Sequence, residues 1–150
     1  MRPGRLGTLL LAGALLGGCA TTAADTPATP RDVLTITCDE LTGQTRGASS
    51  EPVEQTVAVD AAKAFRFTLC SNPSTGFTWE NPVIAGPAGV SLIDHQTVPA
   101  TGSMAGAAGS ETFTFRAASA GTATIDFAYS RPWEGGEKGA WTAQVNVVAS

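Results

Sequence analysis

Short stretches in which apolar and polar residues alternate recur along most of the chain. Successive side chains of an extended strand point to opposite faces, so a period of two marks a strand with one buried face. The segment from Leu34 to Cys38 alternates with threonines, and the segment from Phe65 to Leu69 alternates with Arg66 and Thr68. Helical periodicity is nearly absent. The pattern therefore predicts an all-β protein.

Further strands are predicted between clusters of Gly, Pro, Asn and Asp. About seven short strands with turn-rich connections are typical of an immunoglobulin-like β-sandwich. The stretch from Asp39 to Asp60 is expected to meander without a strand, and Trp79 and Trp141 are expected to fill the core. The further strands are Phe77 to Glu80, Val90 to Thr97, Thr112 to Arg116, Thr122 to Tyr129 and Trp141 to Val148. Inward positions on them are Phe113, Phe115, Ile125, Phe127, Tyr129, Val145 and Val147.

The first residues have the layout of an export signal. Two arginines precede an apolar run from Leu9 to Leu16, which is too short to span a bilayer, and Leu16-Gly17-Gly18-Cys19 follows. This order predicts a bacterial lipoprotein signal over residues 1–18, with Cys19 as the site of lipid attachment. An ordinary secretory signal with an incidental cysteine is the alternative. Residues 19–31 are polar and rich in proline and threonine, and they are predicted to be a disordered tether.

Residues 32–150 are long enough to form one domain with its own core. Removing the signal leaves seven basic against 13 acidic residues, a net charge of −6 without runs of one sign. This composition argues against nucleic acid as a partner and against electrostatic docking on anionic lipid. We expect a monomer that is exported and held at the bacterial cell membrane or envelope through Cys19.

Two cysteines remain once Cys19 is assigned to lipid. An even pair in an exported protein favours a disulfide between Cys38 and Cys70, and two buried free thiols are the alternative. Strand parity points Cys38 inward and Cys70 outward. A bridge therefore requires a bulge, or a strand that ends near Leu69.

Catalytic motifs are missing from the sequence. His95 is the only histidine, which excludes sites that need two, such as the H-E-x-x-H zinc motif. His95 is expected to be a solvated strand residue. Because catalytic triads are defined by geometry, Ser74 with His95 and an aspartate stays open as a minor alternative. The sequence otherwise predicts no enzyme, no cofactor and no metal site.

Three connections contain more proline and glycine than a turn requires. Alternate connections of a β-sandwich emerge at the same end, so we expect these three to lie together. The first loop, residues 72–76, reads Asn72-Pro73-Ser74-Thr75-Gly76 and predicts a stiff finger with a polar tip. It could equally be an ordinary turn. The last loop, residues 130–136, holds Arg131, Pro132 and Trp133 before two glycines, which predicts an exposed interface anchor. A tryptophan that covers the end of the sandwich is the alternative. The middle loop spans residues 102–110.

The loop motifs together resemble the chagasin family of cysteine protease inhibitors, which are immunoglobulin-like proteins. The family's first loop is usually N-P-T-T-G followed by an aromatic residue and a tryptophan, its last loop R-P-W or R-P-F, and its middle loop G-x-G-G. Ser74 replaces threonine and keeps the hydroxyl, while the middle loop departs by one alanine. The matching residues are Asn72, Pro73, Thr75, Gly76, Phe77, Trp79, Arg131, Pro132 and Trp133, and the middle loop reads Gly106-Ala107-Ala108-Gly109.

The resemblance implies a reversible inhibitor of papain-like cysteine proteases over residues 32–150. The first loop would enter the protease cleft at its catalytic cysteine and histidine, and Phe77 is expected among the protease-binding residues. The middle loop and the last loop would grip either side of the cleft. A non-inhibitory immunoglobulin-like binding module of the cell envelope remains the alternative function.

Overall fold

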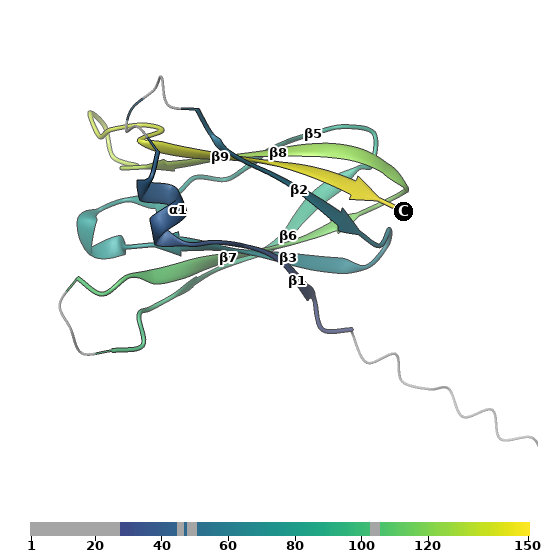
Figure 1. Cartoon of the computed structure of the whole chain (residues 1–150), viewed down its shortest axis with the longest axis horizontal. Helices are drawn as coiled ribbons and strands as arrows, with labels where there is room; N and C mark the ends of the chain where they lie inside the picture. The colour runs from purple at the N-terminus through teal and green to yellow at the C-terminus, as the bar shows by residue number, and fades with distance from the viewer. Residues whose placement is uncertain (1–27, 45–46, 48–50, 103–105) are drawn as a thin grey trace, which may run out of the picture.

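Two β-sheets pack face to face in the computed structural model (Figure 1). The structure describes residues 28–44, 47, 51–102 and 106–150, so the predicted signal, Cys19 and most of the tether lie outside the described residues. The first sheet has the order β1-β3-β7-β6 and the second β2-β9-β8-β4, with β5 also paired to β8. The predicted all-β sandwich is confirmed, with nine strands in the described residues where about seven were expected.

The strands of the two sheets run in both directions. Strand β1 is parallel to β3 and β2 is parallel to β9, whereas the other pairs are antiparallel. The first sheet consists of β1 (Arg31–Ile36), β3 (Ala64–Ser71), β6 (Val90–Val98) and β7 (Gly109–Ala117). The second consists of β2 (Val53–Val59), β4 (Thr78–Trp79), β5 (Val83–Ala85), β8 (Gly121–Ser130) and β9 (Trp141–Ala149).

An aromatic core fills the space between the sheets. Phe67 and Phe115 of the first sheet have ring centroids 5.2 Å apart, and Phe113 meets Phe127 of the second sheet at 5.2 Å in an edge-to-face contact. These four rings are at most 2% exposed, and Trp79 is also 2% exposed. All the predicted inward positions are buried. Burying such large rings supplies much of the hydrophobic free energy of a domain this size.

The stretch from Asp39 to Asp60 was predicted wrongly, because it contains a helix and a strand. Helix α1 (Cys38–Thr42) begins with a capping box, in which Thr37 and Glu40 each accept a hydrogen bond from the other's backbone. This is the T-x-x-E signature of a helix start. Strand β2 alternates along its length and buries Val57 and Val59, so its signal was also present.

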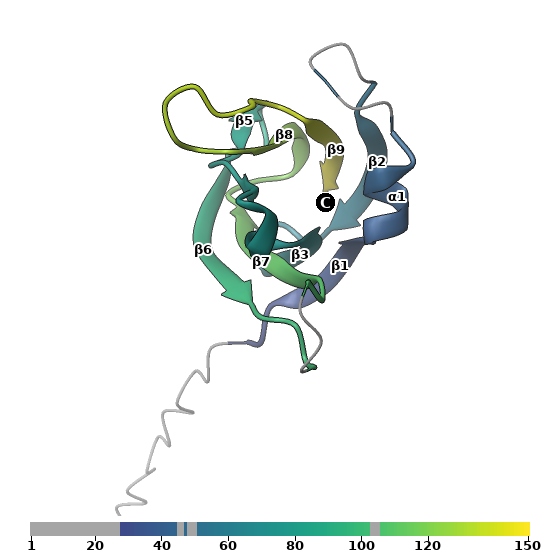
Figure 2. The same cartoon turned by 90° about the vertical axis from the view of Figure 1, so that its left-hand side faces the viewer.

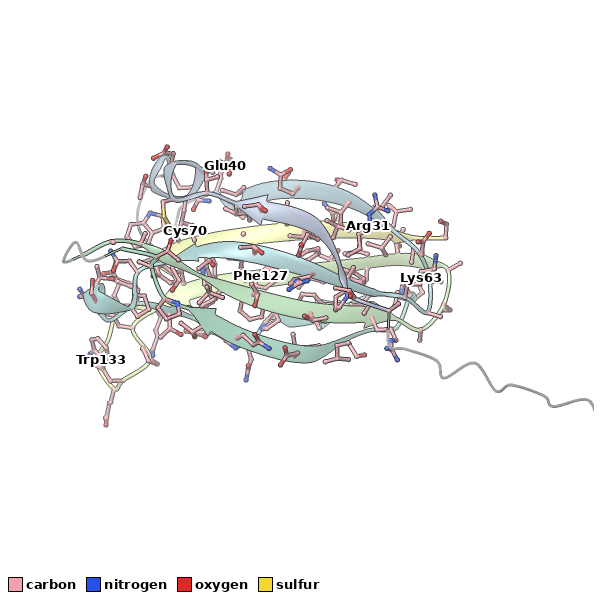
Figure 3. All side chains as sticks on the ribbon, turned by 90° about the horizontal axis from the view of Figure 1, so that it is seen from below. Arg31, Glu40, Lys63, Cys70, Phe127 and Trp133 are labelled. Atoms are coloured by element: carbon pink, nitrogen blue, oxygen red, sulfur yellow. A yellow bond between two sulfur atoms is a disulfide. The ribbon has the colours of Figure 1, made fainter. Side chains whose placement is uncertain are left out.

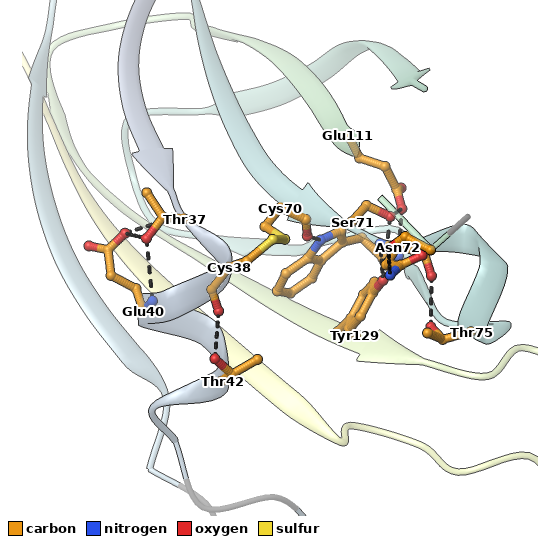
Figure 4. The surroundings of a disulfide bond; sticks show 12 residues. Thr37, Cys38, Glu40, Thr42, Cys70, Ser71, Asn72, Thr75, Glu111 and Tyr129 are labelled. Atoms are coloured by element: carbon orange, nitrogen blue, oxygen red, sulfur yellow. Dashed lines mark hydrogen bonds between the residues drawn. A yellow bond between two sulfur atoms is a disulfide. The ribbon is translucent and has the colours of Figure 1, made fainter. Parts of the chain in front are cut away.

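The disulfide joins Cys38 to Cys70, with their Cα atoms 5.1 Å apart (Figure 4). Strand β1 already ends at Ile36, which pairs with Leu69, and the chain then turns so that Cys38 opens α1 beside Cys70. The expected end of β3 near Leu69 is wrong, because β3 continues to Ser71. The alternative, a bulge, is present in β1, whose register against β3 shifts between Asp32 and Leu34. The bridge joins an N-terminal helix to the strand that leads into the first loop.

The two ends of the sandwich differ. Trp133 lies at one end, whereas Arg31 and Lys63 lie at the opposite end (Figure 3). Helix α1 lies at the end that carries Trp133 (Figure 1). None of the helices in the described ranges is long and apolar enough to cross a membrane.

Candidate functional site

All three predicted loops emerge at the same end of the sandwich. Viewed from this end, the first loop lies in the centre, between the β6–β7 and β8–β9 connections, and α1 lies to one side (Figure 2). The described part of the middle loop comprises Gly102 and residues 106–110. The end of the molecule is therefore a composite surface, and its geometry depends on how the loops contact one another.

The first loop is a single turn of 3₁₀-helix over Pro73–Thr75 that is closed by its own hydrogen bonds. The Thr75 hydroxyl donates to the Asn72 carbonyl at 2.7 Å, and the Ser74 hydroxyl donates to the Asn72 side-chain oxygen. Gly76 ends the turn with φ +81°, a left-handed conformation that suits glycine. Ser74 and Thr75 are exposed at the tip. The tip is thus stiff and polar.

A buried carboxylate fastens the base of the first loop. One oxygen of Glu111, Oε1, accepts from the Ser71 hydroxyl at 2.7 Å and from the Trp79 backbone N–H at 3.2 Å. Ser71 precedes the loop and Trp79 follows it, so a single atom joins both of its ends. Glu111 is 1% exposed. The Trp79 indole N–H adds a bond to the Cys70 carbonyl at 2.9 Å (Figure 4).

Asn72 connects the first loop to its neighbours. Its backbone N–H donates to the Tyr129 hydroxyl at 2.7 Å, which anchors the start of the loop to β8. Its side-chain amide donates to the Gly106 carbonyl at 3.0 Å, which links the first loop to the middle loop. Asn72 therefore fixes the first loop to β8 through its backbone and to the middle loop through its side chain.

The last loop contacts the first loop through a ring and a guanidinium. The Trp133 ring lies against Gly76, and an added Cβ at Gly76 would come within 2.5 Å of it. Arg131 donates to the Thr75 carbonyl at 3.3 Å, and its Cζ lies 4.5 Å from the centroid of the Phe77 ring. Lys138 donates to the Arg131 carbonyl at 2.8 Å and holds the last loop in its bent form.

The exposure of the predicted contact residues divides them into two groups. Trp133 is 52% exposed, which favours an interface anchor over a cover for the sandwich. Pro132 of the last loop and Ala108 of the middle loop are also exposed. Phe77 is 3% exposed and supports the first loop from beneath, so the prediction that it binds the protease directly is corrected. Gly109 is the first residue of β7, where an added Cβ would lie 2.3 Å from the Val98 carbonyl oxygen. Ala107 is half-buried.

His95 is an exposed strand residue on β6, as expected, but its ring also has partners in the fold. Its ring stacks on Phe113 with centroids 4.0 Å apart, and Nε2 lies 2.8 Å from Glu111 Oε2. A register shift between Leu92 and Asp94 places His95 opposite Phe113, and this bulge has no clear signal in the sequence. Ser74 bonds instead to Asn72, so the two residues of the hydrolase alternative have different partners.

Comparison with known proteins decides the family. Residues 58–147, which include all three loops, match the sequence model described as chagasin family peptidase inhibitor I42. The chain belongs to the chagasin family. It is 31% identical to chagasin of Trypanosoma cruzi over 83 residues, which make up 53% of this chain and 76% of chagasin. The protein is accordingly a peptidase inhibitor and not an enzyme.

Two solved structures resemble this chagasin-family chain in fold. The cysteine protease inhibitor EhICP2 from Entamoeba histolytica has a TM-score of 0.52 and 24% identity, with 81% of this chain and all of that chain covered. PbICP-C, solved in complex with falcipain-2, has a TM-score of 0.56 and 13% identity, covering 80% of this chain and 99% of its own. The family match begins at residue 58, so β1, α1 and Cys38 lie outside it.

Proposed function

We propose that this protein inhibits papain-like cysteine proteases reversibly, by inserting the first loop into the active-site cleft. The observation that carries the proposal is the joining of the three loops at one end of the sandwich. Asn72 binds the middle loop and Gly76 supports Trp133 of the last loop, so the three loops form one surface. The resemblance in fold to the inhibitor EhICP2 and to PbICP-C, solved with falcipain-2, supports the same target class.

The first loop is suited to entering a cleft because its shape is fixed before it binds. Its turn, its two hydroxyl bonds and the Glu111 contact at its base restrict the backbone in the free protein. Binding then loses little conformational entropy, which is the usual route to high affinity for a small contact. Thr75 and Gly76 would present backbone and a small hydroxyl to the catalytic centre without a well-placed scissile carbonyl.

The middle loop and the last loop would add specificity and contact area on either side of the cleft. Trp133 is the exposed aromatic anchor, and tryptophan and arginine are the residues that most often dominate binding energy at interfaces. The residues from Gly106 to Ala108 would follow the opposite rim of the cleft through their backbone. The middle loop carries less of the argument, because residues 103–105 lie outside the described residues.

A steady-state inhibition assay tests the proposal. The purified protein at micromolar concentration should inhibit papain and cathepsin L competitively, leave trypsin active, and remain uncut as judged by mass spectrometry. Papain that stays fully active would contradict it. A non-protease partner whose capture is unaffected by changes at Ser74 or Trp133 would favour the envelope binding module instead.

We also propose that the chain is exported and lipid-anchored through Cys19 as a monomer. The support is the order Leu16-Gly17-Gly18-Cys19 after a short apolar run. Arg31 lies at the end of the sandwich opposite Trp133, so a tether entering there would direct the loops away from the membrane (Figure 3). Metabolic labelling with a radioactive fatty acid in a bacterial host should label the wild type, whereas Cys19→Ser should carry no label.

A further inference from the structure

A pocket of about 370 Å³ opens between α1 and the first loop. Its floor is formed by the buried side chains of Leu41, Phe77 and Tyr129. Its rim includes Thr42 of α1 and Thr75 of the first loop, which are both exposed. The rings and aliphatic groups of the floor give the pocket an apolar surface. Removing this surface from water would lower the free energy of a complex.

The pocket adjoins the loops that form the inhibitory surface. Asn72 and Thr75 of the first loop, Ala108 of the middle loop and Arg131 of the last loop all line it. The opposite wall is α1 with the Cys38–Cys70 disulfide, which lies on the same end of the sandwich (Figures 1 and 2). Helix α1, with Cys38, lies outside the part of the chain that matches the family, whereas Cys70 lies within it.

The geometry points to a fourth protease contact, in which this pocket receives an apolar side chain from the wall of the target's cleft. The inference rests on the proposed function. When a loop enters a cleft, the walls of that cleft extend back along the flanks of the loop. The first loop reaches further from the sandwich than α1 does (Figure 1), so a wall on this side would face the pocket.

The size and chemistry of the pocket select the occupant. At about 370 Å³ it lies at the small end of ligand pockets, which span about 300–1,000 Å³, and so suits one large side chain better than an extended ligand. Leu41, Phe77 and the disulfide offer contacts for an aliphatic or aromatic group. Such a side chain, buried next to the centre of the interface, is the usual form of a binding hot spot.

Methyl NMR on the unaltered protein tests the contact directly. The leucine and threonine methyl groups would be labelled and the complex formed with unlabelled papain, followed by a filtered measurement of intermolecular nuclear Overhauser effects. Leu41 and Thr75 methyl groups should both show effects from papain. Effects at Thr75 without any at Leu41 would overturn the fourth contact. If neither methyl group shows an effect from papain, the proposed function is contradicted, and the inference that rests on it is contradicted as well.

Filling the pocket provides a second test. Thr42→Trp adds an indole at the rim from the α1 side, whereas Thr42→Val leaves the pocket open and serves as the matched control. We expect Thr42→Trp to weaken inhibition of papain at least about tenfold and Thr42→Val to change it less than about twofold. Equal inhibition by both variants would overturn the inference. Thermal unfolding of each variant would separate a binding effect from a loss of stability.

Discussion

The Trp133 ring lies directly against Gly76, so the anchor of the last loop is seated on the left-handed turn of the first. A hydrogen at that position leaves room for the ring, whereas a Cβ would stand 2.5 Å from it. The residue that ends the first loop therefore also positions the most exposed aromatic side chain of the last loop. The two loops are mutually dependent.

Replacing Gly76 with alanine should displace Trp133 and weaken inhibition. Gly135→Ala is the matched control, because Gly135 also has a positive φ, +73°, but an added Cβ there meets nothing within 4 Å. Both variants should lose about 1–2 kcal/mol of stability from the left-handed conformation. Only Gly76→Ala should weaken papain inhibition, by about tenfold or more. Equal inhibition constants for the two variants would contradict the seating of Trp133 on Gly76.

The buried Glu111 should be essential to stability. Glu111→Ala leaves the Ser71 hydroxyl and the Trp79 N–H without their acceptor, and each unsatisfied buried donor costs about 1–3 kcal/mol. We expect urea denaturation to show a loss of about 2–4 kcal/mol. Glu54→Ala, an exposed carboxylate on β2, should change stability by less than about 0.5 kcal/mol. A loss of similar size in both variants would refute the role of Glu111.

Removing the disulfide should lower the free energy of unfolding. Cys38 and Cys70 are 32 residues apart, and closing a loop of that length stabilises by about 3–4 kcal/mol in the chain-entropy model. The double variant Cys38→Ala, Cys70→Ala should unfold at a lower urea concentration than the wild type. Dithiothreitol should destabilise the wild type and leave the double variant unchanged. An unaltered wild type under reduction would contradict the bridge.

Acid should weaken the start of α1. Hydrogen bonds from the backbone and side chain of Thr37 hold the pKa of Glu40 below its ordinary value of 4.5. A lowered pKa means that the carboxylate stabilises the folded state above its unfolded pKa, and that this is lost as pH falls through the folded pKa. The small stability difference between wild type and Glu40→Gln, measured at neutral pH, should therefore shrink as the pH falls below 4.5. A difference that stays constant into acid would contradict this.

Trp133→Ala should weaken binding to papain by about 2–4 kcal/mol, because a tryptophan that becomes buried in a contact surface is a typical hot spot. Glu134→Ala changes the neighbouring exposed residue and should leave the inhibition constant within about threefold. Since Trp133 is half exposed, its loss should hardly affect thermal stability. Unchanged inhibition by Trp133→Ala would assign the ring to packing against Gly76 alone.

The strands that bury one face were predictable from the sequence, because period-two alternation follows directly from the geometry of an extended chain. Strands β8 and β9 match their expected segments within one residue at each end, and β3 within two. The loop motifs also fell on the correct connections. The alternation of β2 and the capping box of α1 are local signals as well, and they contradict the prediction of one meandering stretch over residues 39–60.

The internal support of the site could not be predicted in the same way. Glu111 lies 40 residues after Ser71 and 32 residues after Trp79, and nothing local marks a buried glutamate as the acceptor for both ends of a loop. The position of His95 depends on a bulge in β6. The contact of Trp133 with Gly76 depends on two connections meeting in space. These relationships are tertiary, so they become visible only in the folded structure.

A cross-linking measurement tests the insertion of the first loop most directly. In Thr75→Cys a thiol replaces the exposed hydroxyl beside Gly76. With dissolved oxygen as the two-electron oxidant, activated papain freed of reductant should form a mixed disulfide with it through the catalytic cysteine. Ser119→Cys places an exposed thiol in the β7–β8 turn, at the opposite end of the sandwich, and should not form one. The account predicts a cross-linked complex for Thr75→Cys alone. Equal cross-linking of both variants, or none at Thr75→Cys while the protein still inhibits papain, would contradict it.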